Sequence, residues 1–173
     1  MIGRPKKSEA AAYYFTYIDQ VEGNDSLRLM QDQLGEADSL FADISEEKSL
    51  HRYAPEKWNI RQMLNHVTDT ERAFAFRALC FARALDSPLP GYDQNIAADS
   101  AGAGGIAWAA HVEEFRRVRL STIALFQNLP PTAWMRSGTA SDNQFTVRAL
   151  AFIIAGHFAH HARLLRERYL KAS

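Results

Sequence analysis

The sequence predicts an all-α protein folded as a four-helix bundle, with a short additional helix near the N-terminus. Three observations lead to this prediction. Apolar residues recur every three or four positions in four long stretches, polar or proline-containing connections separate the stretches, and few segments alternate as strands do. The 173 residues fit a single domain over 1–173, which is large enough to bury a core without cross-links.

Each long stretch carries signals for where its helix begins or ends. Side chains that can cap a helix N-terminus occur at Asn24, Asp25 and Ser26 before the first helix and at Asn59 before the second. Pro88 and Pro130 cannot continue a helix. Residues 9–22 are expected to form the short extra helix. The four long helices are expected over residues 25–43, 60–85, 106–129 and 145–170. Two small or polar segments are expected to be loops, AADSAGAGG and MRSGTASDNQ.

Composition and charge argue against several classes of protein. Twenty Lys and Arg residues balance twenty Asp and Glu residues, so nothing favours a nucleic-acid partner. Apolar runs are shorter than the roughly 18–20 residues of a membrane span, and the N-terminus lacks the pattern of a signal peptide. Cys80 is the single cysteine, which excludes an intrachain disulfide and fits a small buried side chain. We therefore expect a cytoplasmic protein without a membrane partner.

Histidines are concentrated in the last helix. His157 and His161 lie four residues apart on its apolar stripe, so their side chains can converge on one point. A metal ion at about 2.0–2.1 Å from each nitrogen suits that point, and two hydrogen-bonded core histidines are the alternative. His160 is rotated off the stripe and fits a hydrogen-bonding or solvent-facing position. The remaining histidines outside the second helix, His51 and His111, are expected at the surface.

The second helix offers a third imidazole. His66 lies at the inward edge of the apolar face, so three nitrogens from two helices could meet inside the bundle. Two familiar metal motifs are absent from the sequence: Phe158 stands where His-Glu-x-x-His proteases have Glu, and the Glu-x-x-His pairs of di-iron bundles do not occur. Three neutral protein ligands leave a fourth position for water, which is typical of catalytic metal sites.

Polar residues near His66 are candidates for supporting roles. Asp69 follows His66 by three positions, and its carboxylate could orient the imidazole by accepting from its second nitrogen. Asp93 could reach the mouth of the site as a base, and a turn-forming role fits it equally well. We expect Glu71 on a solvated or salt-bridged face. For Arg77 we expect a structural ion pair, with binding of an anionic substrate as the alternative.

Three segments carry a resemblance to a known family: RYAPEKWNIRQMLNHVTDTERAFAFR, PLPGYDQN and TVRALAFIIAGHFAHHARLLRERY. They are similar to the second-helix motif, the following loop and the closing helix of the DinB-like superfamily. This superfamily consists of metal-binding four-helix bundles and includes the YfiT-type metal-dependent hydrolases. The resemblance extends over nearly the full chain, and it places His66, His157 and His161 at the three metal-ligand positions.

The resemblance implies an up-down-down-up order of helices, a homodimer and a divalent metal ion, with zinc and nickel as the first candidates. It also implies an enzyme with a small-molecule substrate, either a hydrolase or a transferase acting through a low-molecular-weight thiol. Two other classes fit the sequence. One is a metal-binding or sensing module that catalyses no reaction, and the other is a dimeric scaffold whose histidines are only buried.

Overall fold

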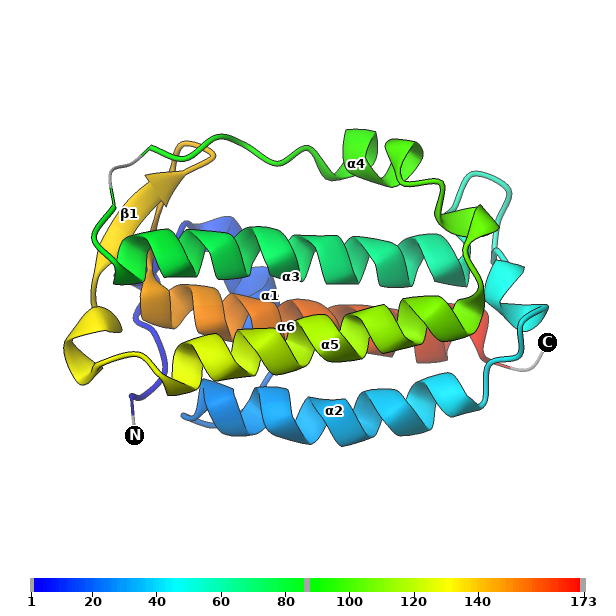
Figure 1. Cartoon of the computed structure of the whole chain (residues 1–173), viewed down its shortest axis with the longest axis horizontal. Coiled ribbons are helices and arrows are strands. Elements are labelled where there is room, and N and C mark those ends of the chain that lie inside the picture. The colour runs from blue at the N-terminus through cyan, green and yellow to red at the C-terminus, as the bar shows by residue number, and fades with distance from the viewer. Residues whose placement is uncertain (1, 86–87, 172–173) are drawn as a thin grey trace.

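A computed structural model describes residues 2–85 and 88–171 of the chain. Within these residues, four long α-helices form a bundle (Figure 1). Their bounds are Ser26–Ala42 for α2, Ile60–Ala82 for α3, Trp108–Gln127 for α5 and Val147–Leu164 for α6. The four-helix bundle predicted from the sequence is therefore confirmed, and each helix begins within two residues of its expected start.

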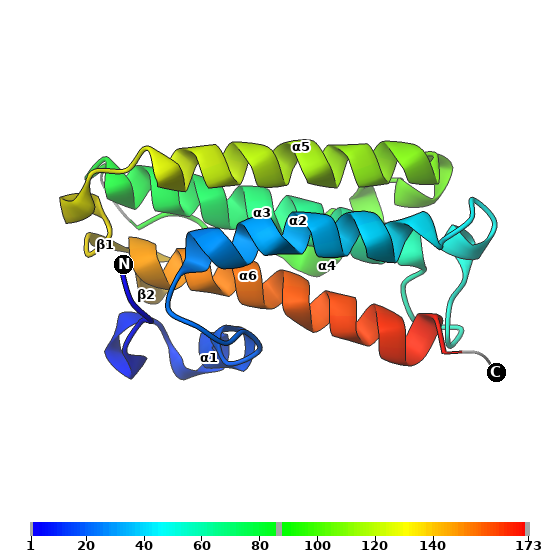
Figure 2. The same cartoon turned by 90° about the horizontal axis from the view of Figure 1, so that it is seen from below.

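The order of the helices is up-down-down-up. In Figure 1, α2 and α6 run from left to right along the chain, whereas α3 and α5 run from right to left. Helices α2 and α3 each pack against both α5 and α6, so α2 and α3 lie on opposite corners of the bundle. The same arrangement, seen from below in Figure 2, leaves α1 beside α6 and away from α5.

Side-chain caps explain where three of these helices begin. Asp25 accepts hydrogen bonds from the backbone N–H groups that open α2, and Thr146 does the same for α6. Asn59 and Gln62 form a reciprocal capping box at the start of α3. Each cap satisfies backbone donors that have no partner within the helix. Together they fix the register of the two helices that carry His66 and His157.

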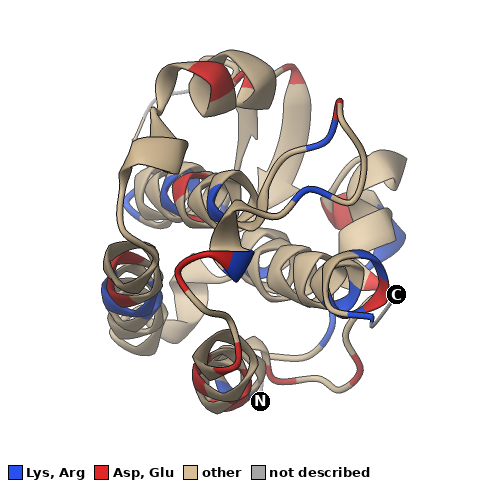
Figure 3. Ribbon diagram, turned by 90° about the vertical axis from the view of Figure 1, so that its right-hand side faces the viewer, with Lys and Arg blue, Asp and Glu red and all other residues tan. Residues whose placement is uncertain are grey.

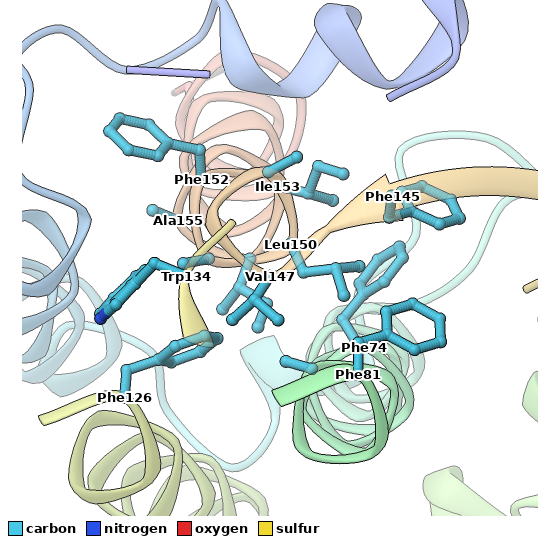
Figure 4. Close-up of a cluster of buried hydrophobic side chains, with 14 of the residues drawn as sticks. Phe74, Phe81, Phe126, Trp134, Phe145, Val147, Leu150, Phe152, Ile153 and Ala155 are labelled. Atoms are coloured by element: carbon cyan, nitrogen blue, oxygen red, sulfur yellow. The ribbon is translucent and has the colours of Figure 1, made fainter. Parts of the chain in front are cut away.

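The core surrounds the first half of α6, which is buried on nearly every side (Figure 4). The sequence predicted one buried stripe along this helix. Phe152, Ile153 and Ala155 are nevertheless buried as completely as Leu150, so the buried surface is wider than one stripe. The reason is that the N-terminal segment with α1 (Phe15–Ile18) covers the face of α6 that points away from α3 and α5. Cys80 lies in this core as a buried free thiol, as expected.

Several short elements differ from the sequence-based expectation. The predicted N-terminal helix over 9–22 is shorter, and consists of α1 and the preceding 3₁₀ turn. The predicted MRSGTASDNQ loop contains an antiparallel hairpin of β1 (Ser137–Ala140) and β2 (Asn143–Thr146). Part of the predicted AADSAGAGG loop belongs to α4 (Gln94–Ser100), which Asp93 caps. Other 3₁₀ turns cover Lys7–Glu9, Lys48–Leu50, Ala103–Gly105 and Pro131–Ala133.

Two helix ends also differ. Helix α3 was expected to extend to residue 85 but ends at Ala82, so Leu85 lies beyond the helix and is exposed. The final helix continues past α6 as a π-helical turn over Leu165–Tyr169, which buries Leu165 and Tyr169 in the smaller of two core clusters. Where this turn begins, Leu165 is buried and Leu164 is only half-buried.

Charged residues of both signs are spread over the helices rather than gathered on one face (Figure 3). Among the helices in residues 2–85 and 88–171, none has both the length and the apolar character that crossing a membrane requires.

Candidate metal centre

Three histidines from two helices meet inside the bundle. His66 projects from α3, while His157 and His161 project from successive turns of α6. One ring nitrogen of each lies within 4.8 Å of the corresponding nitrogens of the other two. The closest pair is Nε2 of His66 and Nε2 of His157, which are 3.2 Å apart. The structure therefore brings together the three residues that the sequence analysis selected.

The donor set fits a divalent metal ion. Two nitrogens bound at about 2.0–2.1 Å to a tetrahedral ion are separated by roughly 3.3–3.4 Å, and the 3.2 Å between His66 and His157 is close to this value. Nδ1 of His161 is buried without a hydrogen-bond partner among the described residues. A buried polar atom without a partner is costly. Closely spaced nitrogens and a buried nitrogen without a partner are both expected of a site that could hold a metal ion.

Thr70 orients the ring of His66. Its hydroxyl lies 3.3 Å from Nδ1 of His66, one helical turn further along α3. When Nδ1 carries the proton of the neutral ring, it donates to Thr70, and Nε2 then presents its lone pair toward His157. A hydrogen bond of this kind fixes the orientation and tautomer that a ligating histidine needs.

Burial keeps these imidazoles neutral. Loss of solvation lowers the pKa of His66 to about 4 and that of His161 to about 3, with the nearby histidines adding to each decrease. The pKa of His157 falls well below its ordinary value, again chiefly through burial. A neutral imidazole is the form that binds a metal. The three rings are therefore available as ligands at neutral pH.

Aromatic rings surround the site and fix its walls. The ring of Tyr17 lies edge-on to His157, with ring centres 5.1 Å apart, and Trp58 lies 4.9 Å from His66. Trp58 is half-buried against the imidazole. His160, which was expected in a hydrogen-bonding or solvent-facing position, is half-buried beside Tyr17, with ring centres 5.6 Å apart, and flanks the site.

A buried ion pair lies within the bundle one turn along α3 from His66. Glu71 accepts two hydrogen bonds from Nε of Arg119, at 2.9 and 3.0 Å, and a third from its Nη2 at 2.8 Å. Arg119 also donates to Gln33, whose amide donates to the carbonyl of Ala155 in α6. Glu71 thus lies in a salt bridge, one of its two expected surroundings, but the pair is buried rather than on a face near water.

The two carboxylates proposed for catalysis have other partners. Asp69 accepts from Asn65 and pairs with Arg72 at 3.0 Å, so the contact to Nδ1 of His66 comes from Thr70 instead. The reason is rotation: a residue four positions after His66 lies more directly over it than one three positions after. Asp93 is exposed and caps α4, which corresponds to the turn-forming role.

The two remaining histidines have different surroundings. His51 is exposed, as expected. His111 was expected at the surface but is buried, and its Nε2 lies 2.9 Å from the carbonyl oxygen of Ala103. The 3₁₀ turn after α4 covers His111, in a region that was predicted to be an open loop.

A cavity of about 200 Å³ opens against His157. Its walls come from the N-terminal segment, from one face of α3, from the loop before α4 and from the β1–β2 turn. Thr70 and Arg77 line it from α3. The ion pair expected for Arg77 is absent among the described residues. Instead its Nη2 donates to the Ser141 hydroxyl at 2.7 Å and weakly to the Pro90 carbonyl at 3.4 Å.

Sequence reasoning did not identify Thr70 or Tyr17 as parts of the site. Thr70 could have been found, because it follows His66 by four positions and shares its helix face. No signal marked Tyr17, which reaches His157 from a segment about 140 residues away in sequence.

Comparisons with known proteins agree with this architecture. The family model for the DinB superfamily matches residues 30–165, and the chain therefore belongs to the DinB superfamily. Among solved structures, the chain is similar to YfiT from Bacillus subtilis, described as a probable metal-dependent hydrolase with an unusual four-helix bundle topology. The two share 16% sequence identity with a TM-score of 0.65, over 94% of this chain and 91% of YfiT. No curated protein matches the chain.

Proposed function

We propose that this protein is a metal-dependent hydrolase of small molecules, with His66, His157 and His161 as its metal ligands. The observation that carries the proposal is the convergence of three neutral imidazoles beside a cavity. Three neutral ligands leave a divalent ion with its full charge and an open position, which is the pattern of catalytic rather than structural sites. Zinc and nickel are the first ions to test.

Bound here, the ion would act as a Lewis acid that polarises a carbonyl group and lowers the pKa of water. The chain's own residues hold and shield the site. Thr70 orients His66, while Tyr17 and Trp58 pack against two of the imidazoles. Low solvent access strengthens electrostatic interactions with a bound substrate.

The relation to YfiT supports the same class, since that protein is described as a probable metal-dependent hydrolase. A transferase that activates a small thiol would use the same Lewis acid. The cavity, at about 200 Å³, is smaller than the roughly 300–1,000 Å³ of typical ligand pockets, which suits a small substrate.

The test is an activity comparison on protein loaded with zinc, nickel or cobalt. Wild type and His157→Ala are assayed for hydrolysis of small esters and amides and for transfer of a small thiol, with His51→Ala as the exposed matched control. We expect hydrolysis that falls by at least about a hundredfold in His157→Ala and is unchanged in His51→Ala. Thiol transfer alone would replace hydrolysis by the transferase class. Metal binding with neither reaction would support a sensing module instead.

A further inference from the structure

The cavity beside His157 contains a buried positive charge without a carboxylate partner. Arg77 is 6% exposed, and the ion pairs among residues 2–85 and 88–171 do not include it. Its partners are neutral oxygens, namely the hydroxyl of Ser141, the carbonyl of Pro90 and the phenol of Tyr14. The other buried arginines show the contrast, because Arg61 and Arg119 both pair with glutamates.

An unpaired buried charge is costly, because neutral partners replace only part of its hydration. Burial lowers the pKa of Arg77 in line with this cost, and the ring of Phe74, 5.5 Å from the guanidinium carbon, offsets little of it. The guanidinium carries five N–H donors, and the two recorded hydrogen bonds both come from Nη2. With Tyr14 as a further partner, the guanidinium still has more N–H donors than neutral partners, and a donor remains for a ligand.

The rest of the cavity wall suits an anion. Among the described residues that line it, none is an aspartate or a glutamate. Several present neutral hydrogen-bonding groups, namely the phenols of Tyr13, Tyr14, Tyr17 and Tyr92, the amide of Gln94 and the hydroxyl of Ser141. A phenol is protonated at neutral pH, so these hydroxyl groups can donate to an anion.

The position of Arg77 on α3 links it to the histidines. His66, Thr70, Ala73 and Arg77 follow one another at four, three and four positions, which places them along one face of the helix. Eleven residues of helix separate the Cα atoms of His66 and Arg77 by about 16 Å. Arg77 and His157 both line the cavity. One small ligand could contact both ends of the cavity.

We propose that Arg77 is the anion-binding residue of this cavity, and that the substrate is a small monocarboxylate whose reactive group lies toward His157. One cation among neutral donors balances one negative charge, which matches a carboxylate better than a phosphate monoester with about two charges at neutral pH. The planar guanidinium can also bind a carboxylate through two parallel hydrogen bonds. The reacting end of this proposal rests on the proposed function, while the anion subsite does not.

The experiment uses metal-free protein, so that failure of the metal site cannot be mistaken for failure of the subsite. Binding of hexanoate and of hexanamide, which have nearly the same size, is measured by calorimetry at low salt on wild type and variants. We expect wild type to bind hexanoate about ten- to a hundredfold more tightly than hexanamide. Arg77→Gln should remove this preference, and Arg77→Lys should retain part of it.

Arg72→Gln is the matched control, because Arg72 lies on the same helix but is half-exposed and pairs with Asp69 and Glu114. It should leave the preference for hexanoate unchanged. Equal binding of hexanoate and hexanamide by wild type would overturn the proposal without the use of any variant. A preference that persists in folded Arg77→Gln, or that Arg72→Gln removes equally, would also overturn it.

Discussion

Gly156 of α6 and Tyr17 of α1 meet backbone to backbone, so closely that a Cβ atom on Gly156 would overlap the carbonyl group of Tyr17. Gly156 immediately precedes His157, and the ring of Tyr17 lies against the imidazole of His157. The absence of one side chain thus lets the N-terminal segment cover the histidine cluster. The same contact closes one wall of the cavity.

Gly156→Ala should therefore loosen this contact. The new methyl group can be accommodated only if α1 moves away, and we expect the free energy of unfolding to fall by about 1–3 kcal/mol in denaturant titrations. Gly35→Ala is the control, since Gly35 lies in α2 with open space around it. That substitution should stabilise the protein by about 0.4–1 kcal/mol. Equal effects of the two substitutions would contradict the close packing of α1 on α6.

Thr70→Val should weaken metal binding, beyond the loss of stability that a buried imidazole nitrogen without its partner causes. The substitution removes the hydrogen bond to Nδ1 of His66 while nearly preserving shape, and loss of such an orienting contact costs about 10- to 100-fold in metal affinity. The matched control is Thr68→Val, whose hydroxyl donates to the carbonyl of Leu64 in the same helix. Competition with a chromogenic chelator gives both affinities, and a similar decrease for Thr68→Val would argue against a special role for Thr70.

Glu71→Gln should be strongly destabilising. It leaves Arg119, which is fully buried, without its counter-charge, and breaking a buried pair from one side costs about 3–5 kcal/mol. Glu113→Gln breaks an exposed pair with Arg117 four residues away and should cost at most about 0.5 kcal/mol. Urea unfolding of both variants provides the comparison. A small effect for Glu71→Gln would show that the pair contributes little to the core.

The metal-free protein should lose stability in mild acid. The pKa values of His66 and His161 in the folded state, about 4 and about 3, lie below the ordinary value of 6.5. The unfolded chain therefore binds more protons as the pH falls below about 6.5, and the folded state is destabilised progressively down to the folded-state pKa values. Each histidine contributes a slope of up to about 1.4 kcal/mol per pH unit.

Urea unfolding between pH 8 and pH 4 measures this dependence. His161→Leu removes one titrating group and should make the decline shallower, whereas His51→Leu, at an exposed position, should leave it unchanged. A free energy of unfolding that does not change between pH 7 and pH 5 would contradict the burial of neutral imidazoles.

The long helices could be predicted because their apolar residues follow the helical period and their caps are explicit, as with Asp25 and Asn59. The hairpin could not, because its strands have four residues each and its polar turn resembles a loop. In that turn Ser141 and Asp142 take positive φ angles of 48° and 59°. Glycine is common at such positions in hairpin turns, but this turn has serine and aspartate there.

Some residues of the candidate site could likewise be predicted from the sequence, and others could not. Helical spacing put His157 and His161 on one face, and burial of the α3 face brought His66 to them. Asp69 was expected to orient His66, whereas the contact comes from Thr70, which follows His66 by four positions and was not considered. Contacts made by the N-terminal segment, such as that of Tyr17, depend on packing between distant parts of the chain. Local patterns therefore gave no sign of them.

The most direct test of the account is the metal content of protein purified without chelators or an affinity metal. Mass spectrometry of the metal should give close to one divalent ion per chain for wild type and for His51→Ala, and much less than one for His66→Ala, His157→Ala and His161→Ala. A folded wild-type protein that takes up no zinc, nickel or other divalent ion, even after incubation with each, would contradict the metal centre.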